Sequence, residues 1–275
     1  MRGGKKAHSV ETVSLSVVIP VYNEAENVGP LVERLRDALE NWPGGAEFIF
    51  VDDGSTDSTF ELLKHAQKND ARVRIAHFRR NLGQTAAMAA GFRLARGQAV
   101  VTLDGDLQND PAEIPRLVQL LKDWDCVCGV RVRRQDGWWK RISSRIGNGF
   151  RNWLTRDDIV DTGCTLKAFR RESLEHLELY RGMHRFLPTL VKMRGCRVTQ
   201  VPVSHHPRAA GKTKYGTWGR MIKGIADVWA VRWMKKNWVD CRPVLEVLEP
   251  VVDEPRRSES ASTDRQSEFS RTLGH

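Results

Sequence analysis

The chain has 275 residues, of which 40% are hydrophobic and 28% are charged, so it can bury a core and is not disordered throughout. Its net charge is +10 at pH 7, and no apolar run reaches the roughly 18 residues of a membrane-spanning helix. The N-terminus has no apolar segment of the kind found in secretory signal peptides. The five cysteines form no C-x-x-C pair, which favours reduced thiols and a cytosolic protein.

The positive charge is concentrated in residues 126–238, which contain 24 basic and 8 acidic side chains. The same segment contains seven of the nine tryptophans. Basic and aromatic residues together indicate contact with a membrane surface rather than with a nucleic acid. A solvated basic face with tryptophans in the core is the alternative interpretation.

Strands and helices alternate through the first half of the sequence. Apolar runs predict buried strands at residues 15–22, 47–53, 73–78, 99–106 and 126–131. Helical patterns lie between them, at residues 25–40, from Asp57 onward, at 85–96 and at 111–123. Asp57 is expected to cap its helix. This order predicts an α/β fold, with a mostly parallel sheet covered by helices on both faces.

Two later segments predict basic amphipathic helices. In residues 138–154 and 217–236, apolar residues recur every three or four positions, and lysines and arginines occupy the other faces. The second stripe includes Trp229 and Trp233. Such helices can lie in a membrane interface with the apolar face inward, or pack that face on the core. Polar composition predicts a flexible N-terminus at residues 1–13 and a disordered tail at 239–275.

Polar residues follow four of the predicted strands, in segments 20–24, 52–57, 79–83 and 104–108. Ligands of open parallel sheets bind beyond the carboxyl ends of the strands, so these segments predict the functional site. The sequence has neither the G-x-G-x-x-G turn after its first strand nor a P-loop motif. We therefore expect neither a dinucleotide site nor a P-loop.

Asp104 and Asp106 are two residues apart at the end of the fourth predicted strand, where extended backbone points both side chains the same way. Carboxylate pairs of this kind can bind Mg²⁺ or Mn²⁺, which often bridge to substrate phosphates. Gly105 between them would leave room for a diphosphate to approach. Alone, the pair is more typical of exposed loop carboxylates; its position beside a second acidic cluster favours a metal site.

Histidines and cysteines predict no further chemistry. His205 and His206 have no third ligand at a suitable spacing, which favours a loop or strand-end role over a metal site. Cys126 and Cys128 alternate in a buried strand, which favours packing over redox chemistry.

The segments PVYNE, VDDGSTDST, RRNLGQ, DGDLQ and RAAGKTKYG occur in this order, and together they resemble family 2 of the glycosyltransferases. They are most similar to the polyprenyl-phosphate members, related to dolichol-phosphate mannose synthase and to undecaprenyl-phosphate sugar transferases. The resemblance covers about residues 14–238 and implies a GT-A fold. Residues 14–215 would form the catalytic domain, and residues 216–238 a helix at the membrane interface. The implied reaction is a metal-dependent, inverting transfer of sugar from a UDP- or GDP-sugar to a polyprenyl phosphate.

The resemblance also implies a set of binding residues. For the nucleotide-sugar donor these are Pro20, Tyr22, Asn23, Glu24 and Asp53. For a Mg²⁺ or Mn²⁺ ion they are Asp104, Asp106 and Gln108, with Asp104 and Gln108 also close to the donor phosphates. For the acceptor phosphate they are Arg131, Lys140, Ser144 and Arg145.

The implied catalytic residues are Asp106, Asp161, Arg208 and Lys214. Asp161 matches an acidic position near the reaction centre, and Arg208 and Lys214 belong to a loop that closes over the diphosphate. A metal ion and two basic side chains can stabilise the leaving diphosphate. A phosphate acceptor is already ionised at neutral pH, so no strong general base is required. Without the resemblance, Arg131, Arg208 and Lys214 would be interpreted as ordinary surface charge.

The implied partners are the donor, a polyprenyl phosphate and a membrane surface, and no nucleic acid. Many relatives have membrane-spanning helices after the region that matches residues 217–238, where this sequence is polar. We therefore expect a peripheral protein on the cytoplasmic side of the membrane, held there directly, as a homo-oligomer or by a membrane-spanning partner. Two alternatives stay open: a soluble family 2 enzyme that glycosylates a saccharide with Asp161 as general base, and a non-catalytic basic adaptor.

Overall fold

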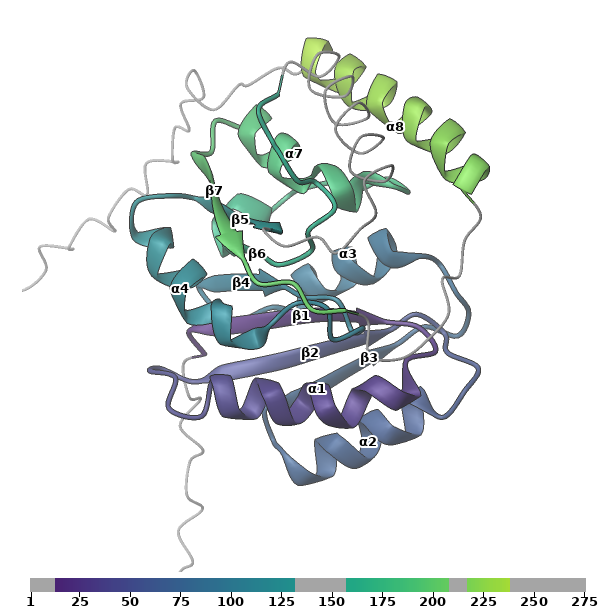
Figure 1. The fold of residues 1–275 in the computed structure, drawn as a ribbon, viewed down its shortest axis with the longest axis vertical. Coiled ribbons are helices and arrows are strands. Elements are labelled where there is room, and N and C mark those ends of the chain that lie inside the picture. Colours follow the sequence, from purple (N-terminus) through teal and green to yellow (C-terminus); the bar gives the residue numbers. More distant parts are fainter. Residues whose placement is uncertain (1–12, 132–156, 208–216, 238–275) are drawn as a thin grey trace, which may run out of the picture. The chain divides into compact units, whose positions relative to one another are not determined.

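The structure is a computed structural model that describes residues 13–131, 157–207 and 217–237, with side chains of the last segment from residue 226 onward. The chain divides into residues 1–238 and 239–275, and the described residues belong to the first part. Seven strands form one sheet: β1 (Leu15–Val21), β2 (Ala46–Asp52), β3 (Val73–His77), β4 (Ala99–Thr102), β5 (Cys126–Arg131), β6 (Lys167–Arg170) and β7 (Val198–Val203). Figure 1 shows these strands with the helices around them: α1 (Ala25–Ala38), α2 (Thr59–Asn69), α3 (Gln84–Leu94), α4 (Ile114–Gln119), α6 (Arg171–Leu174), α7 (Leu187–Met193) and α8 (Thr217–Asn237).

The strand order is β3-β2-β1-β4-β6-β5-β7. Neighbouring strands are parallel except at β6, which runs antiparallel to both β4 and β5. This arrangement confirms the mostly parallel α/β sheet, and all five strands predicted in the first half are present. β4 ends at Thr102 and not at residue 106 as predicted, because the following segment turns away and Leu107 adopts a φ of 62°. β6 was not predicted.

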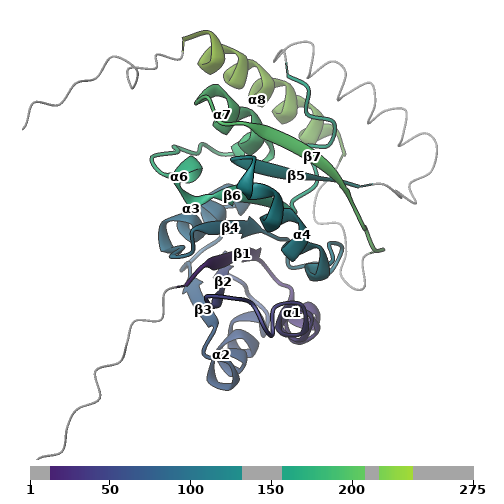
Figure 2. The same ribbon diagram turned by 90° about the vertical axis from the view of Figure 1, so that its left-hand side faces the viewer.

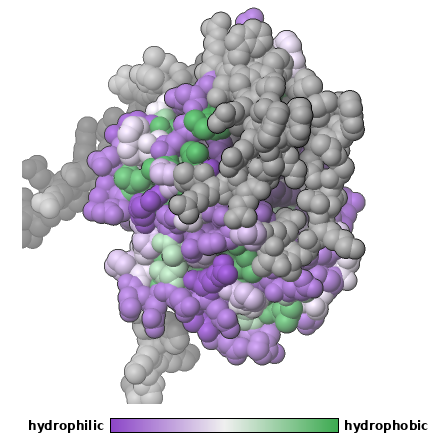
Figure 3. Space-filling view, in the orientation of Figure 1, coloured by the Kyte–Doolittle hydropathy of each residue, from purple (hydrophilic) through white to green (hydrophobic). Residues whose placement is uncertain are grey.

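Helices cover both faces of the sheet, as predicted (Figure 2). Alternate residues of a strand point to opposite faces, so Val17 and Val18 belong to two different cores. Val17 packs with Leu31 of α1 and residues of α2 and α4. Val18 packs with Met88 of α3 and residues of α6 and α7. Figure 3 shows a mostly hydrophilic surface over α1 and α2, as expected for helices that turn their apolar side to the sheet.

The predicted helices are present with small changes at their ends. The helix expected at residues 25–40 is α1, which ends at Ala38, and the helix expected from Asp57 begins at Thr59. The segment expected as one helix at 111–123 is an α-helix of six residues between two short 3₁₀ turns, residues 111–113 and 120–122. Cys126 and Cys128 are buried in β5, which confirms their packing role.

The helix predicted at residues 217–236 is α8, and its two sides differ. Val228 and Val231 are buried and pack with residues 183–190, whereas Trp229 and Trp233 are 58% and 67% exposed. The face turned to the core is therefore not the stripe that contains the two tryptophans. In the helices that the structure describes, hydropathy indicates no membrane span. The helix predicted at 138–154 lies outside the described residues.

Candidate functional site

The sheet order places the candidate site between β1 and β4. From β1 the chain continues to β2 and β3 on one side, and β4 begins the other side. Such a reversal opens a crevice at the carboxyl ends of the strands, where α/β proteins bind ligands. Because β6 is antiparallel, it begins at this same edge: Lys167 pairs with Thr102 at the end of β4. Segments after β1, β2, β4 and β5, and the segment before β6, therefore converge.

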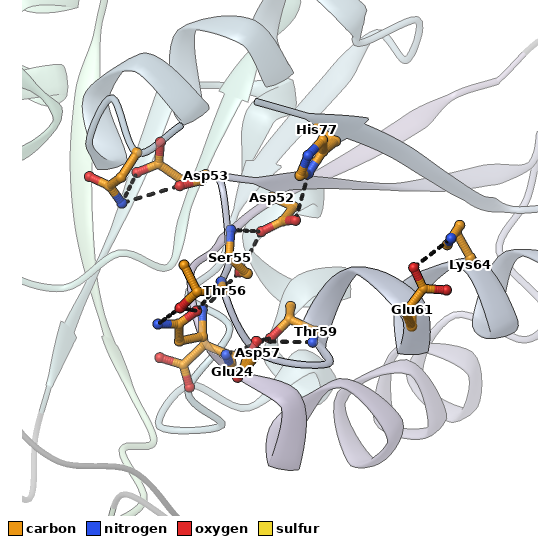
Figure 4. Close-up of polar contacts among 12 residues, drawn as sticks. Glu24, Asp52, Asp53, Ser55, Thr56, Asp57, Thr59, Glu61, Lys64 and His77 are labelled. Atoms are coloured by element: carbon orange, nitrogen blue, oxygen red, sulfur yellow. Dashed lines mark hydrogen bonds and ion pairs between the residues drawn. The ribbon is translucent and has the colours of Figure 1, made fainter. Parts of the chain in front are cut away.

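The segments after β1 and β2, both predicted to bind the donor, are joined by hydrogen bonds (Figure 4). Asn23, at a φ of 51°, donates its backbone N–H to Ser55 Oγ at 2.9 Å. Its side-chain oxygen accepts from the Thr56 N–H at 2.8 Å. The Glu24 N–H donates to Thr59 Oγ1 at 2.8 Å. These contacts make the two segments one surface, with Asn23 and Glu24 half-buried at its edge.

Two aspartates fix the turn after β2. Asp52 is fully buried and accepts from the Ser55 N–H at 3.1 Å and from His77 Nδ1 at 2.8 Å. Asp57 accepts from the N–H groups of Thr59, at 3.0 Å, and Ala25, at 3.4 Å. Burial opposes ionisation of Asp57, but these hydrogen bonds outweigh it and lower its pKa. The N-cap position of α2 is Ser58, one residue after the predicted cap, but Asp57 accepts from the first N–H of α2 and of α1 and so links the starts of the two helices.

Asp53, a predicted donor-binding residue, holds the turn that precedes α3. Its carboxylate accepts from the Leu82 N–H at 2.7 Å, the Gly83 N–H at 2.8 Å and Asn81 Nδ2 at 2.9 Å. Burial raises its pKa, the backbone N–H groups of Leu82 and Gly83 lower it in part, and the charge of Asp52 raises it further. Figure 4 shows Asp53 directed away from Ser55 and Thr56. The position of Asp53 thus has a structural explanation that the sequence did not reveal.

The remaining donor-binding candidates after β1 differ in exposure. Pro20 is buried inside β1, where it pairs with Val51 of β2. β4 pairs with β1 only as far as Val18, so Pro20 lies beyond the last paired residue on that side. This explains how a residue without an N–H group fits a central strand. Tyr22 is half-buried at the edge.

Asp104 and Asp106 follow β4 at the crevice. Asp106 is 6% exposed and Asp104 is half-buried. Gln84, the first residue of α3, donates from Nε2 to Asp104 Oδ1 at 2.8 Å. The Gln108 N–H donates to Asp106 Oδ1 at 3.2 Å, so the predicted metal residues Asp106 and Gln108 are in contact. Gln108 contacts Asp106 through its backbone, and the charge of Asp106 acts on Asp104, so the two carboxylates lie close together.

The electrostatics of this pair fit a divalent cation. Burial, followed by the nearby charge of Asp106, raises the pKa of Asp104 to about 7. A hydrogen bond from Thr165 and the positive charges of Lys167 and Arg131 oppose this rise. Two neighbouring carboxylates that repel one another are stabilised by a cation, and oxygen ligands suit Mg²⁺ or Mn²⁺. Among the described residues no group of three or more His, Cys, Asp or Glu side chains could hold a metal ion.

Gly105 has a different role from the one expected. A Cβ atom at this position would lie 2.7 Å from Val21 Cγ1, and Gly105 is buried. The space that its missing side chain leaves is filled by the end of β1, and not left open for a diphosphate. The glycine therefore lets the segment after β4 approach β1, which brings the metal residues beside the donor-binding segment.

Arg131 and Asp161, predicted for different roles, form one ion pair. Arg131 Nε and Nη2 donate to the two oxygens of Asp161, both at 2.8 Å. The side chains are 16% and 9% exposed. The Gly163 N–H also donates to Asp161, at 3.2 Å. Planar, bidentate pairs of this kind hold both partners in one orientation.

Lys167 is a residue of this region to which sequence reasoning gave no role. It is 2% exposed, and its Nζ donates to the Cys164 carbonyl oxygen. Lysine is almost never fully buried unless it is paired, and the charge of Lys167 acts on Asp104. In the sequence it stands in DTGCTLKAF between Leu166 and Ala168, and no periodic pattern marks it as buried.

The end of β7 contacts the segment that contains the metal residues. His205 forms an isolated bridge with Asn109, and the His206 N–H donates to the Gln108 carbonyl oxygen at 2.9 Å. The predicted strand-end role of the histidines is confirmed. The other predicted residues lie outside the described part of the chain: Lys140, Ser144, Arg145, Arg208 and Lys214.

The doubly wound sheet, with its carboxylate pair at the reversal of strand order, defines the class: a GT-A glycosyltransferase. Residues 16–178 match the family described as Glycosyl transferase family 2. The chain belongs to this family.

Its relatives include a dodecaprenyl-phosphate galacturonate synthase from Rhizobium johnstonii, 40% identical over 81% of this chain and 67% of the relative. An undecaprenyl-phosphate 4-deoxy-4-formamido-L-arabinose transferase from Edwardsiella ictaluri is 39% identical over 74% of this chain and 63% of the relative. The chain thus matches about two thirds of the length of these relatives.

Among solved structures, glucosyl-3-phosphoglycerate synthase from Mycobacterium tuberculosis, in complex with Mn²⁺, UDP and phosphoglyceric acid, has a similar fold. The TM-score is 0.61, with 18% identity over 83% of this chain and 80% of that one. The GT-A fold implied by the sequence is confirmed.

Proposed function

We propose that this glycosyltransferase moves a sugar from a nucleotide-diphosphate sugar to a polyprenyl phosphate at a membrane surface, with inversion. The observation that carries the proposal is the carboxylate pair of half-buried Asp104 and buried Asp106 beside the ion pair of Arg131 and Asp161. Negative groups for a metal ion and positive groups for a phosphate thus meet at one edge of the sheet. The names of the relatives, which are polyprenyl-phosphate enzymes, support the same acceptor class.

The chemistry follows from these charges. When bound, Mg²⁺ or Mn²⁺ supplies positive charge that stabilises the departing diphosphate. Asp104 and Asp106 would hold it, with Gln108 beside them. An oxygen of the acceptor phosphate attacks the anomeric carbon opposite the diphosphate, and the bond to the leaving group breaks with its electron pair. Arg208 and Lys214 are proposed to stabilise that leaving group.

The acceptor phosphate needs orientation more than activation, because it is already ionised. Asp161 holds Arg131 at the end of β5, with its guanidinium at the carboxyl edge of the sheet. We infer that Arg131, with Lys140, Ser144 and Arg145, binds this phosphate. For a saccharide acceptor Asp161 would have to remove a proton, but its carboxylate accepts three hydrogen bonds from Arg131 and one from Gly163. The ion pair therefore favours the phosphate.

Contact with the membrane is proposed to involve α8. Trp229 and Trp233 are one helical turn apart, both exposed, with Arg232, Lys235 and Lys236 nearby in the sequence. Tryptophan is favoured at the membrane–water interface, and each basic residue near an anionic surface contributes about 1 kcal/mol. We therefore propose a peripheral enzyme on the cytoplasmic face of the membrane, with residues 14–215 as its catalytic domain.

A panel of UDP- and GDP-sugars, each with polyprenyl phosphate or a soluble oligosaccharide and with Mn²⁺, tests this proposal. We expect a glycolipid from one donor and no glycosylated oligosaccharide. A glycosylated oligosaccharide without glycolipid would establish the saccharide alternative. The absence of any nucleotide-dependent thermal stabilisation with Mn²⁺ would favour the non-catalytic adaptor.

A further inference from the structure

Gln84 contacts the metal site, although the proposed chemistry gives it no role. Its Nε2 donates to Asp104 Oδ1 at 2.8 Å, a good hydrogen-bond length. Gln84 is the first residue of α3, and Asp104 follows β4, so the contact joins two segments 20 residues apart in sequence. A carboxamide cannot ionise, so it orients a carboxylate without adding charge to the site.

The backbone around Gln84 is fixed from both sides. Before it, Asp53 accepts the N–H groups of Leu82 and Gly83, and Gly83 has a φ of 96° that favours glycine. After it, the Thr85 hydroxyl is 6% exposed and accepts from the Gly182 N–H at 3.0 Å. Gln84 is thus delivered to Asp104 by contacts that do not involve its own side chain.

Asp104 has a particular need for such a partner. Asp104 is half-buried and Asp106, two residues further on, is 6% exposed, so the surrounding protein rather than water must orient the Asp104 carboxylate. The Gln84 N–H compensates one oxygen and fixes the orientation of the group. Partners of this kind around a ligand orient it and tune metal affinity.

Resting on the proposed function, we propose that Gln84 is a positioning residue for the metal: its carboxamide holds Asp104 in the orientation that binds the divalent cation. Asp53 supports Gln84 indirectly, because it fixes the preceding turn at residues 81–83. The motif RRNLGQ therefore serves the metal site through its last residue.

The test is a titration of the full chain with Mn²⁺ alone, followed by calorimetry, for the wild type, Gln84→Met and Gln119→Met. Methionine keeps the length of the side chain and its helix propensity but cannot donate. Gln119 is an exposed glutamine at the end of α4 and has no predicted role in the site, so it is the matched control. We expect Gln84→Met to weaken Mn²⁺ binding about 10- to 100-fold and Gln119→Met to leave it unchanged.

A second readout separates positioning from a general structural role. The thermal midpoint without metal should be the same in both variants, and activity of Gln84→Met should return at saturating Mn²⁺. Equal Mn²⁺ affinity of Gln84→Met and the wild type would overturn the inference and leave the proposed function standing. No Mn²⁺ binding by the wild type would overturn both this inference and the metal dependence of the proposed reaction.

If Gln84→Met does not fold, crystals of the wild type grown with Mn²⁺ decide the question. Gln84 Nε2 within hydrogen-bond distance of Asp104 Oδ1 in the metal-bound protein supports the inference. A Gln84 side chain rotated away from a metal-bound Asp104 overturns it.

Discussion

The two sides of the crevice are built differently. On the β1–β2 side, backbone N–H groups and neutral side chains fix the candidate donor residues, as where Asn23 contacts Ser55 and Thr56. On the β5–β6 side, charged side chains pair in the interior, as Arg131 does with Asp161. The first side therefore presents a rigid polar surface, and the second presents charge. Asp104 lies between them and contacts both, through Gln84 and Thr165.

The largest effect is expected from Asp106→Ala, which removes one carboxylate of the buried pair. Because a metal ion contributes several kcal/mol of transition-state stabilisation, we expect kcat/KM to fall by at least about 10³-fold. Far-UV circular dichroism should show an intact fold. Asp123→Ala, at an exposed position before β5, is the control. Full activity of Asp106→Ala would remove Asp106 from the metal site.

The next effect concerns the charged side of the crevice. Asp161→Asn leaves the Arg131 guanidinium, 16% exposed, without its counter-charge. Removal of one partner from a buried ion pair costs about 3–5 kcal/mol, which urea unfolding can measure. The double variant Arg131→Met/Asp161→Asn should lose less than the sum of the single variants, because the two residues act as a unit. Strictly additive losses would show that the pair does not act as a unit.

A smaller effect is expected at the exposed face of α8. Trp229→Ala/Trp233→Ala removes two exposed aromatic rings from α8 while Val228 and Val231 keep their packing. Binding to vesicles that contain anionic lipid, measured by co-sedimentation, should weaken about tenfold or more, at unchanged thermal stability. Trp124→Ala, at a tryptophan 36% exposed outside α8, should bind as the wild type does. An equal loss of vesicle binding in the double variant and in Trp124→Ala would show that α8 has no special role in membrane binding.

The smallest effect is a change of stability with pH, and it tests the contact between Thr85 and His184. Burial, and then the charges of Arg185 and Lys167, lower the pKa of His184 to about 3, and its Nδ1 is 2.8 Å from Thr85 Oγ1. Above pH 6.5, His184 is neutral in both the folded and the unfolded chain, so its titration does not change the free energy of unfolding. Between pH 6.5 and 3 only the unfolded chain takes up its proton, so stability falls by up to about 1.4 kcal/mol per pH unit.

Urea unfolding of the wild type and His184→Gln at pH 7 and 5.5 measures this effect. Glutamine can still accept from the Thr85 hydroxyl but does not titrate. The variant should lose less stability than the wild type between the two values. Identical losses would show that His184 titrates normally in the folded protein.

Much of the β1–β2 side was predictable because its signals are local. A strand, a polar turn and a helix follow one another in sequence, so the strand ends and the position of the Asp104 and Asp106 carboxylates beside them could be predicted from periodicity and spacing. The hydrogen bonds of Asp53 to residues 81–83 could not be predicted, because these partners are distant in sequence and donate mainly through the backbone. The pattern at Gly105 likewise did not reveal that Val21 would fill the space.

The β5–β6 side was harder to predict. β6 has only four residues, and its antiparallel insertion between β4 and β5 has no periodic signature. The pairing of Arg131 with Asp161 and the burial of Lys167 follow from that insertion. In α8 the helical period was correct, but the period alone did not separate the packed valines from the exposed tryptophans.

The central claim is that the incoming group is a lipid-linked phosphate. The most direct measurement compares transfer to a polyprenyl phosphate with transfer to the polyprenol of the same chain length, using the same donor, Mn²⁺ and full-length chain. We predict glycolipid from the phosphate alone. Equal product from the alcohol would contradict the account, because the positive charge around Arg131 would then have no phosphate to bind.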